Sequence, residues 1–494
     1  MFERLWKKSP ESFFFSLFFK MRVVNKRRRD GMEHILQDLQ GRLLTQQQMQ
    51  ERFGQEVLEN IQKEICVMEG LIRESDGTPV CQRCHNHSID NFATMPSLDT
   101  RKEIYYCLQC LQMGRILEGD KLYHIPSCKH DIQERSNYLL TWKGKLSPQQ
   151  EVASQELIAS LTDYRRPHLV YAVTGAGKTE MIFPVINEVL MKGGRVALAS
   201  PRVDVCLELF PRIQAAFENT ECLLMYGGTD QTYHYTPIMV LTTHQLLKFR
   251  EAFDLVIVDE VDAFPYVNSN MLHEAVNQSV KKPMGKRVYL TATPDAHLFQ
   301  AMDNRKISVT RLPARFHGFP LVVPEFVWVG NWQDFFMQGK KNRKLKKLIK
   351  EFLLSDGARL LFSPSIEMAE QIYRWMLENF PDIPSHVVHS KDSSRKEKVQ
   401  KLRDGTILLL ISTTILERGV TFNNCQVLII GAESSMYSSS ALVQMSGRVG
   451  RKADFPTGRL IFAHFGISKA MKEAKRQIQA MNALALERGL LRRE

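Results

Sequence analysis

The sequence predicts an α/β protein in which two tandem lobes with parallel sheets follow a small zinc-binding module. The length of 494 residues suits roughly three domains. Beyond Gly144, short apolar runs alternate with helical stretches, which is typical of parallel strands joined by crossover helices. Two Cys-x-x-Cys pairs lie ahead of that region. The expected parts are a basic extension (1–31), a helical segment (32–75), the zinc module (76–140), the first lobe (141–312), a linker (313–338) and the second lobe (339–494).

The composition excludes several classes of protein. Hydrophobic residues make up 44% of the chain and charged residues 24%, which is ordinary for a globular protein. A mainly disordered chain, a collagen-like fibre and a small disulfide scaffold are therefore excluded. No stretch approaches the ~20 apolar residues that span a bilayer. Nine cysteines are too few for a disulfide-stapled secreted protein of this size, which indicates the reducing cytosol.

The net charge of +12 is concentrated in two patches. Residues 1–31 carry nine basic and three acidic side chains, and residues 340–350 carry seven basic and no acidic ones. Such patches bind phosphate chains or anionic membrane surfaces, although a basic run is also simply the solvated face of many helices. The spacing of Leu345, Leu348 and Ile349 predicts a helix in the second patch.

The N-terminal extension has two interpretations. Residues 13–19 read FFFSLFF and lie between basic segments, a pattern that suits a peripheral membrane anchor. Alternatively, translation begins at Met21 or Met32 and the stretch is not part of the working protein. We favour the second interpretation because the composition changes abruptly after the second basic run.

Four cysteines predict a structural zinc site. Residues 32–71 are polar with helical periodicity, and then Cys81-Gln-Arg-Cys84 is followed, 22 residues later, by Cys107-Leu-Gln-Cys110. Two such knuckles can close a tetrahedron of thiolates around Zn²⁺, leaving no open position for water. Other potential ligands lie nearby, and we leave them out of the site: Cys66, His85, His87 and Cys128.

A phosphate-binding loop follows the first predicted strand. Strands are expected at 169–173, 195–199, 238–242, 255–258 and 287–291 in the first lobe, and at 359–363, 407–411, 427–430 and 459–463 in the second. The first strand leads into Thr174-Gly175-Ala176-Gly177-Lys178-Thr179. The glycines let backbone N–H groups face a phosphate, Lys178 can reach the β- and γ-phosphates, and the Thr179 hydroxyl can bind Mg²⁺.

Acidic and basic partners for that loop occur farther along the chain. The apolar run 255–258 ends in Asp259-Glu260, where Asp259 can hold Mg²⁺ and Glu260 can orient and deprotonate an attacking water. In the second lobe, Arg448 and Arg451 lie on one face if their segment is helical. From a facing lobe they could meet the γ-phosphate as arginine fingers, which are typically worth about 10³–10⁵ in rate.

The order of these motifs resembles that of the superfamily-two helicases and translocases, from Leu146 to the C-terminus. The resemblance implies two RecA-like lobes, ATP hydrolysis to ADP and phosphate, and a role for Gln150 in reading adenine and for Gly419 in binding the nucleotide. Ala172 stands where the strict pattern of the phosphate-binding loop has a glycine. Further segments match strand-binding and coupling motifs: Ser200-Pro201-Arg202, Tyr226-Gly227-Gly228, Thr242-Thr243-His244, Thr291-Ala292-Thr293-Pro294, Ser363-Pro364-Ser365 and residues 412–419.

A closer resemblance is to the ComFA family of late-competence ATPases from Gram-positive bacteria. It is carried by the four-cysteine module before the motor, DEVDAFPY at 259–266, TTILERGV at 413–420 and GAESS at 431–435. This resemblance implies zinc on the four cysteines and ATP-driven translocation of single-stranded DNA. It also implies a cytoplasmic protein, peripheral at the inner face of the membrane, that acts with the DNA-uptake channel and other competence proteins in natural transformation.

Two other functions remain open at this stage. A duplex-separating helicase of replication restart or repair shares the motor signatures, although no strand-separating insertion is apparent. A zinc-dependent DNA-binding adaptor without ATPase activity belongs to a different class, and it is disfavoured because every catalytic position is occupied.

Overall fold

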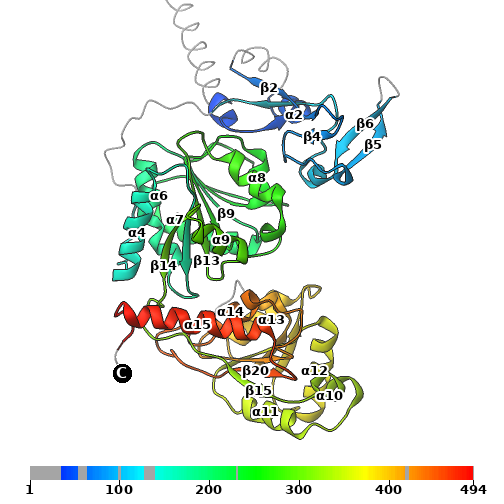
Figure 1. Ribbon diagram of the computed structural model, residues 1–494, viewed down its shortest axis with the longest axis vertical. Helices are drawn as coiled ribbons and strands as arrows, with labels where there is room; N and C mark the ends of the chain where they lie inside the picture. Colours follow the sequence, from blue (N-terminus) through cyan, green and yellow to red (C-terminus); the bar gives the residue numbers. More distant parts are fainter. Residues whose placement is uncertain are drawn as a thin grey trace, which may run out of the picture.

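The computed structural model describes residues 35–53, 64–97, 102–126, 140–229, 232–417 and 422–492 (Figure 1). An N-terminal module, a first lobe and a second lobe follow one another along the longest axis of the molecule. None of the helices in these ranges has the length and apolarity needed to cross a membrane. The predicted N-terminal extension and Gly419 lie outside the described residues.

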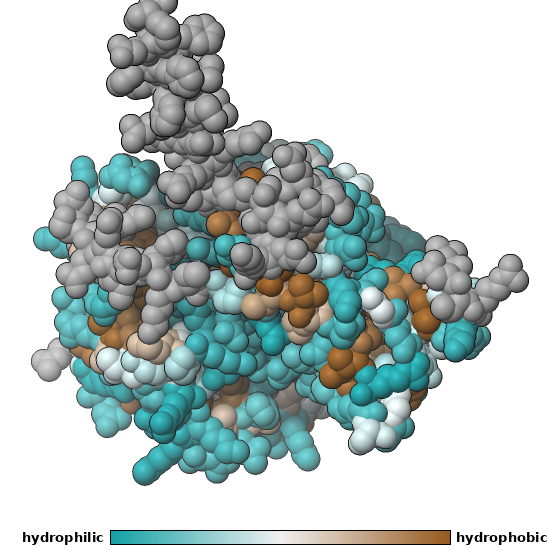
Figure 2. Space-filling model, turned by 90° about the horizontal axis from the view of Figure 1, so that it is seen from above, coloured by the Kyte–Doolittle hydropathy of each residue, from teal (hydrophilic) through white to brown (hydrophobic). Residues whose placement is uncertain are grey.

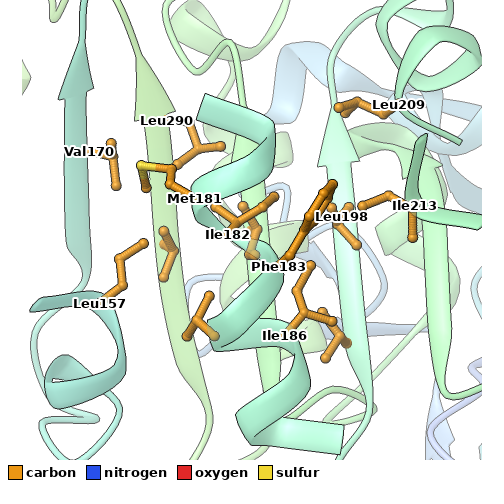
Figure 3. Close-up of a cluster of buried hydrophobic side chains, with 14 of the residues drawn as sticks. Leu157, Val170, Met181, Ile182, Phe183, Ile186, Leu198, Leu209, Ile213 and Leu290 are labelled. Carbon is orange, nitrogen blue, oxygen red and sulfur yellow. The ribbon is translucent and has the colours of Figure 1, made fainter. Parts of the chain in front are cut away.

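The first lobe is built on a seven-stranded parallel sheet in the order β10-β11-β9-β12-β13-β8-β14. Alternate residues of each strand face opposite sides, so Leu198 of β9 belongs to the core that the sheet forms with α4, α6 and α7, whereas Ala197 belongs to the core on the side of α8. Figure 3 shows the first of these two cores. The elements are α4 (Pro148–Ser160), β8 (His168–Ala172), α5 (Lys178–Met181), α6 (Phe183–Met191), β9 (Val196–Ser200), α7 (Val203–Ala216), β10 (Cys222–Met225), β11 (Ile238–Thr242), η3 (Thr243–Lys248), β12 (Leu255–Asp259), η4 (Tyr266–Asn268), α8 (Asn270–Ser279), β13 (Lys286–Thr291), α9 (Ala296–Asp303) and β14 (Ser308–Leu312).

The second lobe has a six-stranded parallel sheet in the order β15-β20-β19-β16-β18-β17. Helices α10, α11 and α12 cover one face of it, and α13, α14 and the first half of α15 cover the other. The elements are β15 (Glu325–Trp328), α10 (Trp332–Gln338), α11 (Arg343–Leu353), β16 (Ala358–Phe362), α12 (Ile366–Asn379), β17 (Ser385–Val388), α13 (Arg395–Arg403), β18 (Leu409–Ser412), η5 (Thr414–Leu416), β19 (Cys425–Ile430), α14 (Ser439–Ser446), β20 (Leu460–His464) and α15 (Lys469–Glu487).

The N-terminal module consists of three small antiparallel sheets, β1-β7-β2, β3-β4 and β5-β6. Seen from above, the described surface of the molecule shows hydrophobic residues interspersed among hydrophilic ones (Figure 2). Cysteines and apolar residues of the module share one buried cluster with α8 and η3 of the first lobe, so the module is docked on that lobe. Its elements are β1 (Leu44–Thr45), α2 (Gln46–Phe53), β2 (Cys66–Glu69), β3 (Leu71–Arg73), β4 (Pro79–Cys81), η1 (Ile89–Asn91), β5 (Phe92–Pro96), β6 (Glu103–Cys107), η2 (Leu108–Met113) and β7 (Lys121–His124).

Helix α15 connects the two lobes. Met471 and Ala474 belong to the core of the second lobe, whereas Met481 belongs to the core of the first. The Asn482 side chain accepts from the backbone N–H of Leu321 and donates to its carbonyl, both at 2.8 Å. The helix crosses between the lobes in Figure 1 and therefore fixes the linker against both of them.

The fold class and every predicted strand are confirmed, as is the helix in the second basic patch, where Leu345, Leu348 and Ile349 are buried. Two expectations were wrong. The 32–75 segment is not wholly helical, because β1, β2 and β3 pair within the module. The expected linker 313–338 is too long, because β15 pairs with β20 and α10 packs on the second sheet.

Candidate active site and candidate metal centre

A cavity of about 530 Å³ opens where the carboxyl ends of the first sheet face the second lobe. Most of the side chains that sequence analysis selected for nucleotide chemistry line this single cavity. Both lobes contribute, which is the arrangement expected for a site that closes when the lobes approach. The lining residues are Lys145, Gln150, Thr174, Gly175, Ala176, Gly177, Lys178, Thr179, Glu180, Val205, Glu208, Leu209, Arg212, Asp259, Glu260, Phe316, Gln444, Gly447, Arg448, Arg451 and Lys452.

The loop after β8 has the backbone of an anion cradle. Gly175 and Gly177 have φ values of 82° and 76°, a region that residues with a side chain rarely adopt. Gly177 immediately precedes α5, and the first residues of that helix, Lys178 and Thr179, line the cavity. The helix N-terminus therefore faces the cavity. Lys178 Nζ lies 3.3 Å from Asp259 Oδ1. Because Thr179 and Asp259 supply the hard oxygen ligands that Mg²⁺ prefers and line the same cavity, the residues fit that ion.

Glu260 occupies a strained backbone position at the end of β12. Its φ of 56° lies in the left-handed region, which typically costs a non-glycine residue about 1–3 kcal/mol. The Asp259 carboxylate accepts a 2.9 Å hydrogen bond from the Glu260 backbone N–H. This turn directs both side chains into the cavity, so two carboxylates share one wall with Lys178.

Gln150 supports the phosphate-binding loop from behind. Its buried amide group donates to the carbonyls of Ala176 and Gly177 at 3.2 and 3.0 Å, and its Oε1 accepts from the backbone N–H of Ser147 at 2.8 Å. This network explains why α4 begins where it does and why the loop is held firmly. The role of Gln150 in reading adenine stays a prediction.

Arg448 and Arg451 reach the cavity from a turn. Helix α14 ends at Ser446, and Gly450 has a φ of 67°, so the two arginines are not placed by helical periodicity. Arg448 donates to the carbonyl of Glu417 at 2.5 Å. Burial lowers the pKa of Arg451, although Glu208 and Glu260 partly offset that effect.

Sequence analysis missed the linker side chains that hold this turn. Arg315 and His317, which are both buried, converge on the carbonyl of Gly450, with His317 Nε2 at 3.2 Å. Burial, with a smaller contribution from Arg451, lowers the pKa of Arg315 to about 10, so the guanidinium stays charged at neutral pH. Only a tertiary contact could have identified these residues, because the linker has no motif of its own.

A polar network also joins the lobes beside the cavity. The Asp262 carboxylate accepts from the hydroxyls of Thr291 at 2.6 Å and of Thr293, and it lies 3.1 Å from Ser440 Oγ. Ser440 and Gln444 of α14 both donate to Thr293 Oγ1, at 2.8 and 3.2 Å. Asp262 and the Thr291–Pro294 segment belong to quoted motifs, but their partners in α14 were not anticipated.

The predicted strand-binding segments follow carboxyl ends of strands. Residues 200–202, 226–228 and 242–244 come at or after the ends of β9, β10 and β11, and residues 363–365 and 412–417 come at or after those of β16 and β18. The carboxyl ends of parallel strands lie at the same edge of a sheet. The predicted strand-binding segments of each lobe therefore lie together at one edge of its sheet.

The four cysteines form a closed cluster. Their ligand atoms all lie within 4.8 Å of one another, with Cys81–Cys110 and Cys84–Cys107 sulfur distances of 3.7 and 3.5 Å. A tetrahedron with Zn–S bonds of ~2.3 Å has edges of about 3.8 Å, so the thiols fit zinc. Hydrogen bonds from the neighbouring thiols, Cys107 first, raise the pKa of the Cys84 thiol.

Arg83 ties the cysteine cluster to the first lobe. Its buried guanidinium donates to Cys110 Sγ at 3.3 Å and to the Cys110 carbonyl at 3.0 Å. Gln278 of α8 donates to the Arg83 carbonyl at 3.0 Å, and its Oε1 lies 3.2 Å from His85 Nε2. The candidate metal centre is therefore part of the docking surface, and no described contact connects it with the nucleotide cavity.

Three family comparisons match consecutive parts of the chain. Residues 27–124 match the competence protein ComFA N-terminal domain, residues 143–296 match the type III restriction enzyme res subunit, and residues 340–453 match the helicase conserved C-terminal domain.

Two similar proteins share most of the chain. A competence protein ComFA of Streptococcus pneumoniae is 40% identical over 90% of this chain and 98% of its own length. A competence protein ComFA of Bacillus subtilis is 42% identical over 82% of this chain and 86% of its own length. Among solved structures, RecG bound to a three-way DNA junction has a TM-score of 0.50 at 16% identity, covering 71% of this chain and 47% of RecG, which supports the fold alone.

Proposed function

The chain belongs to the ComFA family of competence proteins, and from this premise we propose that it is an ATP-dependent translocase of single-stranded DNA. Membership, together with the matches to the type III restriction enzyme res subunit and the helicase conserved C-terminal domain, makes it a competence-related, ATP-dependent, helicase-like protein. The finer proposal is that it drives the import of transforming DNA across the cytoplasmic membrane. Peripheral placement at the inner face, beside the uptake channel and other competence proteins, is part of the proposal.

The single observation that carries the proposal is the shared cavity. Lys178 and Asp259 line it from the first lobe, and Arg448 and Arg451 line it from the second. A γ-phosphate placed by Lys178 would meet the arginines across the cleft, so its transition-state charge would be stabilised by both lobes. Thr179 and Asp259 would hold Mg²⁺, which neutralises phosphate charge when bound.

The carboxylates and the polar network give hydrolysis a mechanical consequence. Glu260 would orient the attacking water and accept its proton. Cleavage separates the γ-phosphate from the arginines, so the attraction that holds the lobes closed weakens. Because Asp262, Thr293 and Ser440 bond across the cleft, lobe movement would be transmitted to the segments at the strand ends. Alternating grip on a DNA strand would then produce movement.

The decisive experiment compares ATP turnover with single-stranded DNA, duplex DNA and RNA at matched nucleotide concentrations. We expect strong stimulation by single-stranded DNA alone. Robust unwinding of a tailed duplex would instead favour a repair-type helicase. Turnover that stays at background with every nucleic acid would contradict the translocase and favour the adaptor.

A further inference from the structure

The linker after the first sheet reverses the usual burial pattern. Ala314, Arg315 and His317 are 2%, 1% and 3% exposed, whereas Phe316 between them is 53% exposed. A buried arginine beside an exposed phenylalanine is informative, because burial normally favours the opposite arrangement. Arg315 and His317 are explained by their contacts with the Gly450 carbonyl. The exposed ring needs a separate explanation.

Phe316 lines the nucleotide cavity together with Gln150 and Lys178. It is the aromatic residue among the described side chains around that cavity, which are otherwise charged, polar or aliphatic. One side of the ring meets His317 in an edge-on contact with centroids 5.2 Å apart. Its exposed surface is therefore available to a ligand in the cavity.

Two hydrogen bonds fix the backbone that carries this ring. Gln149 donates to the Ala314 carbonyl at 2.7 Å, and the Phe316 N–H donates to the Gly175 carbonyl at 3.2 Å. The linker is thus bonded both to α4 beside Gln150 and to the phosphate-binding loop. Because the backbone at Phe316 is already ordered, little backbone freedom is lost when a ligand binds against the ring, which favours affinity.

Gln150 alone cannot hold a nucleobase. Both N–H groups of its amide are used by the loop carbonyls, and one lone pair of Oε1 is used by Ser147. One lone pair remains, enough to accept a single hydrogen bond from an exocyclic amine. A planar base also needs a flat apolar surface, which an aromatic ring provides.

We infer that Phe316 stacks on the base of the bound nucleotide, while the remaining lone pair of Gln150 accepts from its amino group. This inference rests on the proposed function only in that the cavity takes ATP. Stacking contributes affinity for every base, since every base has a π face. Gln150 would favour adenine, whose 6-position carries a donor, over guanine, whose 6-position carries an acceptor.

The test measures dissociation constants by calorimetry in the absence of DNA. The ligands are ADP, GDP and inorganic tripolyphosphate, and the variants are Phe316→Ala, Phe316→Tyr and Phe465→Ala. Phe465 is a matched control, because it is 54% exposed and lies outside the cavity lining. Phe316→Ala should weaken ADP and GDP about tenfold or more and leave tripolyphosphate unchanged. Phe316→Tyr should restore nucleotide affinity, and Phe465→Ala should match the parent.

Two results would overturn the inference. Equal losses for ADP and tripolyphosphate would mean that the ring only supports the loop, and unchanged ADP binding would mean that the base lies elsewhere. Neither result depends on DNA. ATP turnover that DNA fails to stimulate would contradict the translocase proposal. The ratio of ADP to tripolyphosphate affinity would still test the role of Phe316.

Discussion

The cysteine cluster takes its four ligands from residues 81–110, whereas the nucleotide cavity collects side chains from residues 145–452. The cluster is fully buried and fixed by Arg83, and the cavity is open and lined mainly by charged and polar groups. A closed site of local origin can only stabilise its surroundings. An open site shared by two lobes can change its shape when its ligand changes, which is what a motor requires.

The largest expected effect comes from a substitution in the nucleotide cavity that should leave the cysteine cluster intact. Lys178→Ala should lower DNA-stimulated ATP turnover about a hundredfold or more, because a cationic partner of the transition-state charge is lost. Zinc content and the circular dichroism spectrum should not change, since Lys178 is no part of either core. Lys192→Ala is a suitable control, because Lys192 pairs with Glu188 on the first lobe outside the cavity. Parent-like turnover in Lys178→Ala would contradict the site.

The reciprocal change targets the cluster. Cys81→Ser should reduce bound zinc to a small fraction of one ion per chain, because three thiolates no longer complete the tetrahedron. Nucleotide affinity should be retained, since the cavity shares no described contact with the cluster. Elemental analysis measures the first effect and calorimetry the second. Cys222→Ser, which alters a cysteine outside the cluster, should keep its zinc. Undiminished zinc in Cys81→Ser would refute the four-thiolate site.

A smaller effect is expected where the lobes bond to each other. Thr293→Val keeps the side-chain shape but removes the hydroxyl that contacts Asp262, Ser440 and Gln444. DNA-stimulated turnover should fall about threefold to tenfold, in line with about 0.5–1.5 kcal/mol per hydrogen bond, while the Kd of ATP stays unchanged. Thr310→Val, in β14, provides the control. A change in Kd alone would place Thr293 in binding and not in coupling.

The smallest effect concerns the docking of the module. Gln278→Ala removes the contacts with His85 and the Arg83 carbonyl and should cost about 1–2 kcal/mol of local stability. Hydrogen exchange in the module should become faster while its zinc content is retained. Gln400→Ala, on α13 of the second lobe, should leave that exchange unaltered. Slower or unchanged exchange in Gln278→Ala would mean that the module is held by its apolar contacts alone.

Sequence patterns predicted the two regions to different depths. Parallel strands, the phosphate-binding loop and the cysteine pairs could be predicted because each depends on local spacing or on continuous apolar runs. Strands β10, β14, β15 and β17 were not predicted, nor were the short strands of the module, because short apolar runs have little detectable periodicity. The inter-lobe partners Ser440, Arg315 and His317 could not be found, since their contacts arise only when distant segments pack.

The path of α15 has a consequence for biosynthesis. Its first half completes the second core, and its second half enters the first core and bonds to Leu321. During translation every strand of both sheets is therefore synthesised before the helix that joins the two lobes. A product terminated before Lys469 would contain every nucleotide-facing residue named above. It would still lack the helix that holds the two lobes at a fixed distance from each other.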